Sequence, residues 1–143
     1  KDIDYGYVGD VEKVDGKALA DLIHRQIVPV MAPLTHDGNG NLLNTNADTI
    51  AGETAKALAE YFDVTLVYCF EKKGVLRDEN DDDSVIPVLT TDLFKQYVEE
   101  GIVQGGMIPK LENSISALDA GVSQVVITLA SAIYKDSGTI IRK

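Results

Sequence analysis

Cysteine is almost absent from this sequence, which contains one cysteine, Cys69, and no tryptophan. A single cysteine cannot form an internal disulfide, which argues against a small disulfide-stabilised secreted fold and favours a cytoplasmic protein. Cys69 lies in an apolar run, without a histidine or cation pattern that would favour the reactive thiolate. We therefore predict a small core residue at this position rather than a nucleophile.

Basic residues are scarce relative to acidic ones. The 143-residue chain has 13 Lys and Arg against 23 Asp and Glu, which gives a formal net charge of −10. Because binding to nucleic-acid phosphates needs basic surface, no nucleic-acid partner is expected. The sequence also lacks an apolar run of membrane-spanning length and a secretory signal pattern, so no membrane partner is expected.

Several motifs of catalysis and metal binding are missing as well. The sequence has no Walker-type phosphate loop, no zinc-ligand spacing and no nucleophile elbow. Its most acidic run, residues 78–83, fails as an EF-hand loop, because the sixth position is Asp83 rather than glycine and the twelfth is Leu89 rather than glutamate. We predict a solvated loop there and no metal-ligating residues.

The sequence does contain alternating strand-like and helix-like segments in an ordinary globular composition, 45% hydrophobic and 25% charged. Strands are predicted over residues 7–14, 28–32, 64–70, 124–129 and 139–141, and helices over 17–26, 49–62, 91–100 and 109–122. This alternation predicts an α/β fold, a three-layer αβα sandwich with a mostly parallel sheet covered on both faces. Residues 1–143 would form a single domain, and because the first residue is Lys1 rather than methionine, we expect part of a longer chain.

The first distinctive motif is Asn-Thr-Asn-Ala-Asp at residues 44–48. It follows a turn-rich loop, residues 36–41, that contains Asp-Gly and Asn-Gly, and it precedes the alanine-rich helix. Asn46 is a good N-cap, and Asp48 falls in the first turn, where a carboxylate complements the helix dipole. Taken alone, this motif needs no function beyond starting a helix.

A second motif at a predicted helix start is Gly-Gly-Met-Ile-Pro-Lys at residues 105–110, and the two motifs together are more informative than either alone. Gly105 and Gly106 allow the backbone to approach a ligand, and Pro109 suits the first helical position. Lys110 lies in the first turn, where its charge opposes the helix dipole by about 0.3–1 kcal/mol. A solvated lysine could be tolerated there at small cost, but a cation at this end of a helix also suits the binding of an anion.

Together, the two motifs resemble the C-terminal half of acetylglutamate kinases, in the amino-acid kinase superfamily. The run Val-Pro-Val-Met-Ala-Pro at 28–33, the Gly-Val-Leu turn at 74–76 and Gly138-Thr139 fit the same pattern, so the resemblance covers nearly the whole chain. It implies the amino-acid kinase fold, with residues 1–143 as the nucleotide-binding half of a longer enzyme whose N-terminal, acylglutamate-binding half is absent. It further implies a cytoplasmic enzyme of arginine biosynthesis that forms a homo-oligomer.

The resemblance also implies roles for particular residues. Lys110 would stabilise charge on the γ-phosphoryl group of ATP, and Asp48 would orient Lys110 and a second lysine carried by the absent half. Asn44 and Asn46 would bind the N-acylglutamate, whose γ-carboxylate is the nucleophile. Mg²⁺ would bridge the ATP phosphates without a dedicated protein motif. The nucleotide itself would contact Lys73, Gly74, Val75, Leu76, Ile102, Val103, Gln104, Gly105 and Gly106.

The sequence departs from the family in two places. Many members have Thr-Asp or Ser-Asp where this chain has Tyr-Cys-Phe-Glu at residues 68–71 and two extra residues, which leaves the nucleotide contacts of residues 68–73 open. The segment from Thr128 to Gly138 is shortened by what would be a helix. The chain alone is expected to be inactive, because the family's second lysine and its glycine-rich substrate loop belong to the absent half. Two alternatives to an acylglutamate kinase stay open: another carboxylate or carbamate kinase of the superfamily, or a regulatory nucleotide-binding module of the same fold. The acyl group and any feedback by arginine are not determined by these residues.

Overall fold

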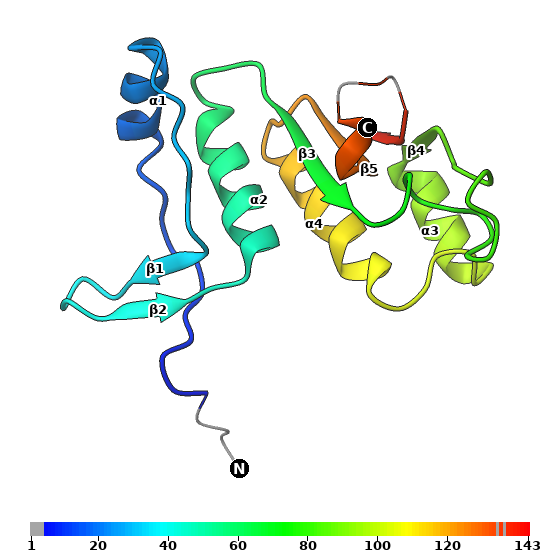
Figure 1. Ribbon diagram of the computed structural model, residues 1–143, viewed down its shortest axis with the longest axis horizontal. Helices are drawn as coiled ribbons and strands as arrows, with labels where there is room; N and C mark the ends of the chain where they lie inside the picture. Colours follow the sequence, from blue (N-terminus) through cyan, green and yellow to red (C-terminus); the bar gives the residue numbers. More distant parts are fainter. Residues whose placement is uncertain (1–4, 134, 136) are drawn as a thin grey trace.

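The computed structural model describes residues 5–133, 135 and 137–143. They form a two-stranded hairpin, a four-stranded sheet and four α-helices (Figure 1). The hairpin pairs β1 (Leu34–His36) with β2 (Leu42–Asn44) in antiparallel register. Its loop is the predicted Asp-Gly and Asn-Gly turn, in which Gly38 and Gly40 adopt positive φ angles of 76° and 97°.

The larger sheet has the strand order β3-β5-β6-β4. Its strands are β3 (Thr65–Phe70), β4 (Val88–Thr90), β5 (Gln124–Leu129) and β6 (Thr139–Arg142). The pairs β3–β5 and β4–β6 are parallel, and β5–β6 is antiparallel. The predicted α/β fold with a mostly parallel sheet flanked by helices is therefore confirmed. The predicted cover on both faces is not seen among the described residues, because Val67, Cys69 and Ile140 leave one face of the sheet exposed.

The helices begin where the sequence supplies N-caps. Helix α1 (Gly16–His24) is capped by Asp15, α2 (Ala47–Leu58) by Asn46 and α3 (Thr91–Glu99) by Thr90, and each cap side chain accepts a backbone N–H of the first turn. Helix α4 (Met107–Asp119) has no side-chain cap. It starts two residues earlier than predicted, so Pro109 is its third residue; proline is still tolerated there, because N–H groups in a first turn have no helical partner.

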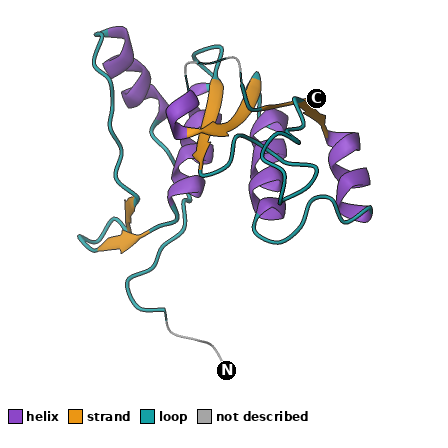
Figure 2. Ribbon diagram, turned by 45° about the vertical axis from the view of Figure 1, so that its right-hand side comes forward, coloured by secondary structure: helices purple, strands orange, loops and turns teal. Residues whose placement is uncertain are grey.

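Helices α2, α4 and α3 lie side by side in that order along the sheet, and α1 packs against α2 (Figures 1 and 2). The core fills the space between this row of helices and the facing side chains of the strands. Its fully buried members include Leu89, Leu111, Val125, Ile127 and Ile141. This core fixes α4, which carries Lys110, against the sheet.

Two predicted strands do not form. Within residues 7–14 only Val8 makes a β-bridge, to Asn44, and residues 28–32 are not a strand. Val28 and Val30 are 82% and 94% exposed rather than buried. An apolar run becomes a buried strand only when a neighbouring strand supplies hydrogen bonds and cover, and among the described residues none lies beside 28–32.

Cys69 also differs from its prediction, because it is exposed. It lies in β3, an edge strand whose side chains alternate between the covered and the open face of the sheet. Tyr68 points into the core, so Cys69 points away from it. Exposed Val67 and Ile140 also lie on β3 and β6.

Candidate active site

The position of Asp48 follows from how β2 leads into α2. Thr45, between them, is 5% exposed, and its hydroxyl lies 2.8 Å from that of Thr35 across the hairpin. Asn46 then turns the chain into the helix by accepting a hydrogen bond from Thr49 N–H at 3.1 Å. Asp48 is thereby held in the first turn of α2, with a side chain that is partly exposed.

Lys110 reaches Asp48 from the first turn of α4. Its Nζ donates to Oδ2 of Asp48 at 2.6 Å, and the two side chains are 25% and 36% exposed. The lysine at the unfavourable end of α4 is thus paired with a carboxylate from another helix. The pair is accessible enough to meet a ligand and sheltered enough for its charges to interact more strongly than on an open surface.

Strand β3 supports both members of this pair. The ring of Phe70 lies beneath the ammonium of Lys110, with 4.1 Å between Nζ and the ring centroid. The hydroxyl of Tyr68 donates to the backbone carbonyl of Asp48 at 3.2 Å. Burial, followed by the charges of Asp48 and Glu53, raises the pKa of Tyr68 to about 12, so this hydroxyl remains a donor throughout the neutral range.

The pair opens into a cleft of about 480 Å³. Asn46, Asp48 and Lys110 line it from the two helix starts, and Val8, Gly9 and Asp10 line it from the N-terminal segment. Asn44 does not line this cleft: its backbone N–H and carbonyl bind Tyr7 and Gly9, and its side chain is exposed. The structure thus brings three of the four predicted catalytic and substrate residues together.

A second cleft, of about 340 Å³, collects six of the predicted nucleotide residues: Gly74, Val75, Leu76, Ile102, Val103 and Gln104. Lys72 and Met107 line it too. Met107 and Lys110 are three residues apart on α4, so the first turn of this helix borders both clefts. A cleft of this size, mostly apolar with a few polar groups, suits a flat aromatic base such as adenine.

The Gly-Val-Leu turn is fixed to the sheet by Thr139. The hydroxyl of this buried threonine accepts from Val75 N–H at 2.8 Å and donates to the carbonyl of Ile86 at 2.7 Å. Gly74 passes so close that a Cβ there would lie 2.7 Å from Thr139 Oγ1 and 3.0 Å from its backbone nitrogen. Glycine is needed at this position because only hydrogen fits.

Three predicted nucleotide residues lie outside the lining of the second cleft. Gly105 and Gly106 lie between Gln104 and Met107, which do line it, and a Cβ at either glycine would meet no protein atom within 4 Å. Lys73 donates to Asp83 Oδ1 at 2.6 Å. This hydrogen bond and the accompanying charge attraction raise the pKa of Lys73 and lower that of Asp83.

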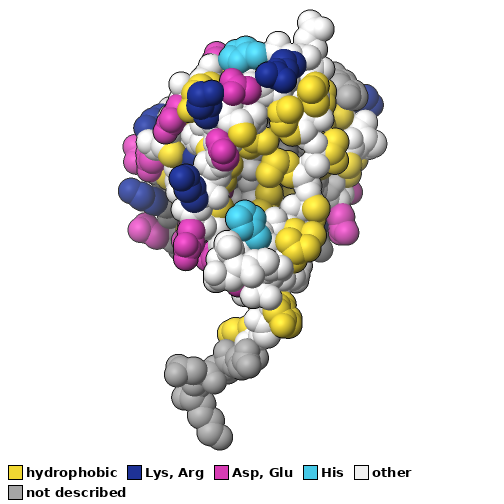
Figure 3. Space-filling model, turned by 90° about the vertical axis from the view of Figure 1, so that its left-hand side faces the viewer, with side chains coloured by type: hydrophobic (Ala, Val, Ile, Leu, Met, Phe, Trp, Pro, Cys, Tyr) yellow, Lys and Arg dark blue, Asp and Glu magenta, His cyan; other side chains and the backbone are white. Residues whose placement is uncertain are grey.

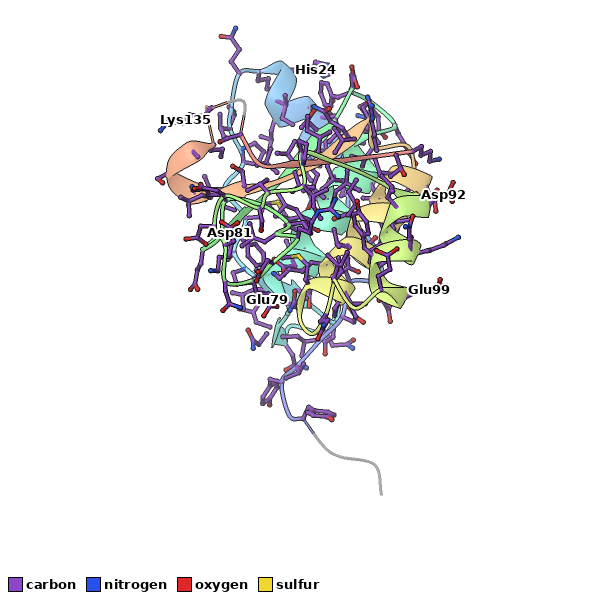
Figure 4. The ribbon with its side chains drawn as sticks, turned by 90° about the vertical axis from the view of Figure 1, so that its right-hand side faces the viewer. His24, Glu79, Asp81, Asp92, Glu99 and Lys135 are labelled. Atoms are coloured by element: carbon purple, nitrogen blue, oxygen red, sulfur yellow. The ribbon has the colours of Figure 1, made fainter. Side chains whose placement is uncertain are left out.

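Residues 78–83 of the acidic loop are all exposed, as predicted for a solvated loop, but two ion pairs also hold the loop in place. Asp82 accepts from Lys72 Nζ at 3.1 Å, in addition to the Asp83–Lys73 pair, so the loop lies against the rim of the second cleft. Glu79 also lines this cleft. Figure 4 shows Glu79 and Asp81 together on the loop, on the opposite side of the view from Asp92 and Glu99 of α3.

Across residues 5–133, 135 and 137–143, no three His, Cys, Asp or Glu side chains come together as a set that could hold a metal ion. A Mg²⁺ ion that entered with a nucleotide would be held mainly by phosphates, as this cation commonly is. None of the described helices is long and apolar enough to cross a membrane.

Comparison with known proteins shows the family to which this fold belongs. The model of the amino acid kinase family matches residues 1–129, so the chain belongs to that family. Within it, the acetylglutamate kinases of Phocaeicola vulgatus and Bacteroides thetaiotaomicron are 78% and 75% identical to it over 143 residues, all of this chain and 56% of each relative. The chain thus spans just over half the length of these relatives. A crystal structure of smu.665 from Streptococcus mutans superposes with a TM-score of 0.76 at 32% identity, covering 97% of this chain and 52% of that one.

Sequence reasoning missed the supporting residues of the site. Tyr68, Phe70 and Thr139 were assigned to strands, because a strand pattern shows only which residues alternate and not what their tips contact. For Phe70, the last residue of β3, an aromatic side chain at the end of a strand was the available signal, since ligands bind at the carboxyl ends of strands in open α/β sheets. Tyr68, inside β3, and Thr139, at the start of β6, had no such signal. Lys72 and Met107 were equally recognisable as neighbours of predicted nucleotide residues.

Proposed function

We propose that the parent protein is an ATP-dependent N-acyl-L-glutamate 5-kinase of arginine biosynthesis, and that this chain is its nucleotide-binding half. The contact between Lys110 and Asp48 carries the proposal, because it lies at the helix turn that borders both clefts. The identity to acetylglutamate kinases over the whole chain supports it. A regulatory module that transfers nothing would have no use for a partly exposed lysine held by a carboxylate between two clefts.

In this proposal the γ-carboxylate of the acylglutamate attacks the γ-phosphorus of ATP. An oxygen–phosphorus bond forms to the carboxylate as the bond to the β-phosphate oxygen breaks, which yields an acyl phosphate and ADP with no net proton transfer. No general base is needed, because a glutamate carboxylate is ionised at neutral pH. Catalysis then consists of alignment and of positive charge at the moving phosphoryl group.

Different residues of this chain supply the positive charge and the alignment. Lys110 donates to the phosphoryl oxygens, where negative charge accumulates, and Asp48 holds the flexible lysine stem in place. Asn44 and Asn46 bind the acylglutamate. Residues 74–76 and 102–106, with Lys73, bind the nucleotide, and their apolar side chains suit the adenine ring. No described residues form a set of their own for Mg²⁺, which would enter with the phosphates of the nucleotide and would neutralise part of their charge.

The proposal assigns the other half of the parent chain to a particular surface. Large hydrophobic residues are exposed along the segment after α1 and on the hairpin: Ile27, Val28, Val30, Met31, Leu34 and Leu42. Figure 3 shows this side of the molecule, where yellow hydrophobic side chains gather. A monomer rarely leaves such a surface open, so we assign it to contact with the remaining 40–50% or so of the parent chain. The proposal includes a cytoplasmic location, which the single cysteine and the family resemblance favour, and a homo-oligomeric assembly, which rests on the family resemblance alone.

The test uses the full parent chain. Millimolar Mg-ATP should raise its melting temperature, because a ligand that binds only the native state stabilises it. Release of ADP should depend on an N-acylglutamate, and a panel of N-acetyl-, N-succinyl- and unacylated glutamate, with carbamate and aspartate as further acceptors, identifies the substrate. A folded parent chain without a thermal shift, or with turnover only on carbamate, would contradict the proposal.

A further inference from the structure

Three elements converge on the ammonium group of Lys110. The lysine comes from α4, its carboxylate partner Asp48 from α2, and the ring of Phe70 from the last residue of β3. Phe70 is partly buried and packs against the hydrophobic core, so its ring is held by the sheet and does not depend on the lysine for its position. Neither cleft includes Phe70 in its lining, and the contact that links its ring to the site is the one with the Lys110 ammonium.

The two contacts to Lys110 are chemically different. Asp48 offers a full negative charge at 2.6 Å, whereas Phe70 offers the electron-rich face of a neutral ring at 4.1 Å. A second carboxylate would hold the ammonium as well, but it would cancel the positive charge that an anionic ligand needs. An aromatic face attracts the cation without adding a negative charge.

Lysine needs such a second contact for geometric reasons. Its ammonium lies at the end of four rotatable bonds, and a single ion pair leaves the stem free to swing about that contact. An error of about 1 Å in a group that stabilises a transition state can cost on the order of 100-fold in rate. A rigid ring that touches the ammonium from a different element removes much of this freedom.

We propose that Phe70 is a positioning residue for the phosphoryl-transfer step, and that its ring, together with Asp48, holds the Lys110 ammonium in the catalytic position. This inference rests on the proposed kinase function. Phe70 touches no substrate; it acts through Lys110 alone.

The experiment compares three variants of the full parent chain by steady-state kinetics. Phe70→Leu keeps apolar bulk and removes the aromatic face, so kcat should fall by roughly 2- to 30-fold, the range of measured cation–π energies converted to rate. The KM values for Mg-ATP and acylglutamate should change much less. Phe70→Tyr keeps the ring and should restore most of kcat. Phe62→Leu removes another partly buried ring, which packs against His24 in a tilted geometry. Phe62 lines neither cleft, so this variant should leave kcat unchanged.

A double-mutant cycle separates positioning from general stability. In a Lys110→Met background, Phe70→Leu should have no further effect on kcat, and the melting-temperature losses of the two changes should be less than additive. Equal loss of kcat from Phe70→Leu with and without Lys110, or fully additive melting temperatures, would overturn the proposal. If the wild-type parent chain shows no kinase activity, the proposed function fails, while the stability cycle still decides whether ring and ammonium interact.

Discussion

Lys110 and Asp48 are 62 residues apart in the chain, yet Lys110 Nζ donates to Asp48 Oδ2 at 2.6 Å across the first turns of two helices. The same helix α2 carries a second ion pair, Lys56 with Glu53, at 2.7 Å and with nearly the same exposed fractions, 24% and 36%. That second pair lines neither cleft. It therefore provides a matched control for the first.

We expect Lys110→Met in the parent enzyme to lower kcat by about 10²–10³ and to raise KM for acylglutamate much less, because the lysine acts on charge that develops in the transition state. Asp48→Asn should have a similarly large effect on kcat, since the capping residue Asn46 is kept and the fold survives. The double variant should lose much less than the product of the two, because the residues act as a unit. Steady-state kinetics and circular-dichroism melts measure these effects.

The control variants for this test are Lys56→Met and Glu53→Gln, which should leave kcat within about twofold, because this partly exposed pair lines neither cleft and a pair three residues apart on a helix contributes only ~0.3–0.5 kcal/mol to stability. If Asp48 merely complemented the helix dipole, Asp48→Asn would cost about 0.3–1 kcal/mol of stability and leave turnover normal. A folded Asp48→Asn enzyme with a normal kcat would refute the mechanism.

Gly106→Ala tests for a ligand beside the start of α4. Gly106 has a φ of −67°, and a Cβ there would meet no protein atom, so the change in folding stability should stay below about 1 kcal/mol. If phosphates approach this backbone, KM for Mg-ATP should rise by about tenfold, equivalent to ~1.4 kcal/mol of lost binding. An unchanged KM in a folded variant would remove Gly106 from the nucleotide site.

The companion variant Gly74→Ala should lower the stability of the fold directly and weaken nucleotide binding as a consequence. Its new Cβ would collide with Thr139 Oγ1, so we expect a loss of about 1–3 kcal/mol in the free energy of unfolding, measured with denaturant. Nucleotide binding should weaken with it, because Val75 and Leu76 line the second cleft. Normal stability would show that the turn relaxes away from Thr139.

Replacing Asp81, Asp82 and Asp83 with serine should leave kcat nearly unchanged, because none of them lines a cleft. The change removes the ion-pair partners of Lys72 and Lys73, and Lys72 lines the second cleft. The KM for Mg-ATP should therefore fall by about twofold at low salt, and by less at high salt because salt screens the charges. Initial rates at about 20 mM and about 300 mM salt measure this salt dependence of KM for Mg-ATP. A large loss of kcat that added calcium restores would instead reveal a metal site.

Tyr68→Phe tests the support of Asp48 through pH. The pKa of Tyr68 is raised from 10.0 to about 12 in the folded chain, so between pH 10 and 12 the unfolded state loses its proton first and stability falls as pH rises. This loss approaches ~2 kcal/mol at the upper end of that window. Tyr68→Phe should abolish that part of the slope in denaturant titrations at pH 9, 10 and 11.

The control for Tyr68 is Tyr61→Phe, which removes a tyrosine hydroxyl from a side chain that is 44% exposed. At pH 7, Tyr68→Phe should cost about 1 kcal/mol for the lost hydrogen bond to the Asp48 carbonyl. A Tyr68→Phe variant with the wild-type slope above pH 10 would contradict the assigned pKa.

The sequence by itself determined the local structure. Strand β5 and the starts of helices α1, α2 and α3 follow from alternation of apolar residues and from capping by Asp15, Asn46 and Thr90, all of which act between near neighbours in the chain. The same signals placed Asp48 and Lys110 in first turns. Resemblance of the two motifs, rather than any local pattern, indicated that these turns belong to one site.

The tertiary structure alone decided what depends on distant residues. Whether residues 28–32 are a buried strand depends on a neighbour, and none lies beside them among the described residues, so the apolar run is exposed. Cys69 is exposed because its side chain lies on the open face of the sheet, and which face the helices cover is not written in a local pattern. The contacts of Phe70 with Lys110, Tyr68 with Asp48 and Thr139 with Val75 all join residues from different elements. Such contacts form only when the core packs these elements together, because their geometry is set by that packing and not by neighbours in the chain.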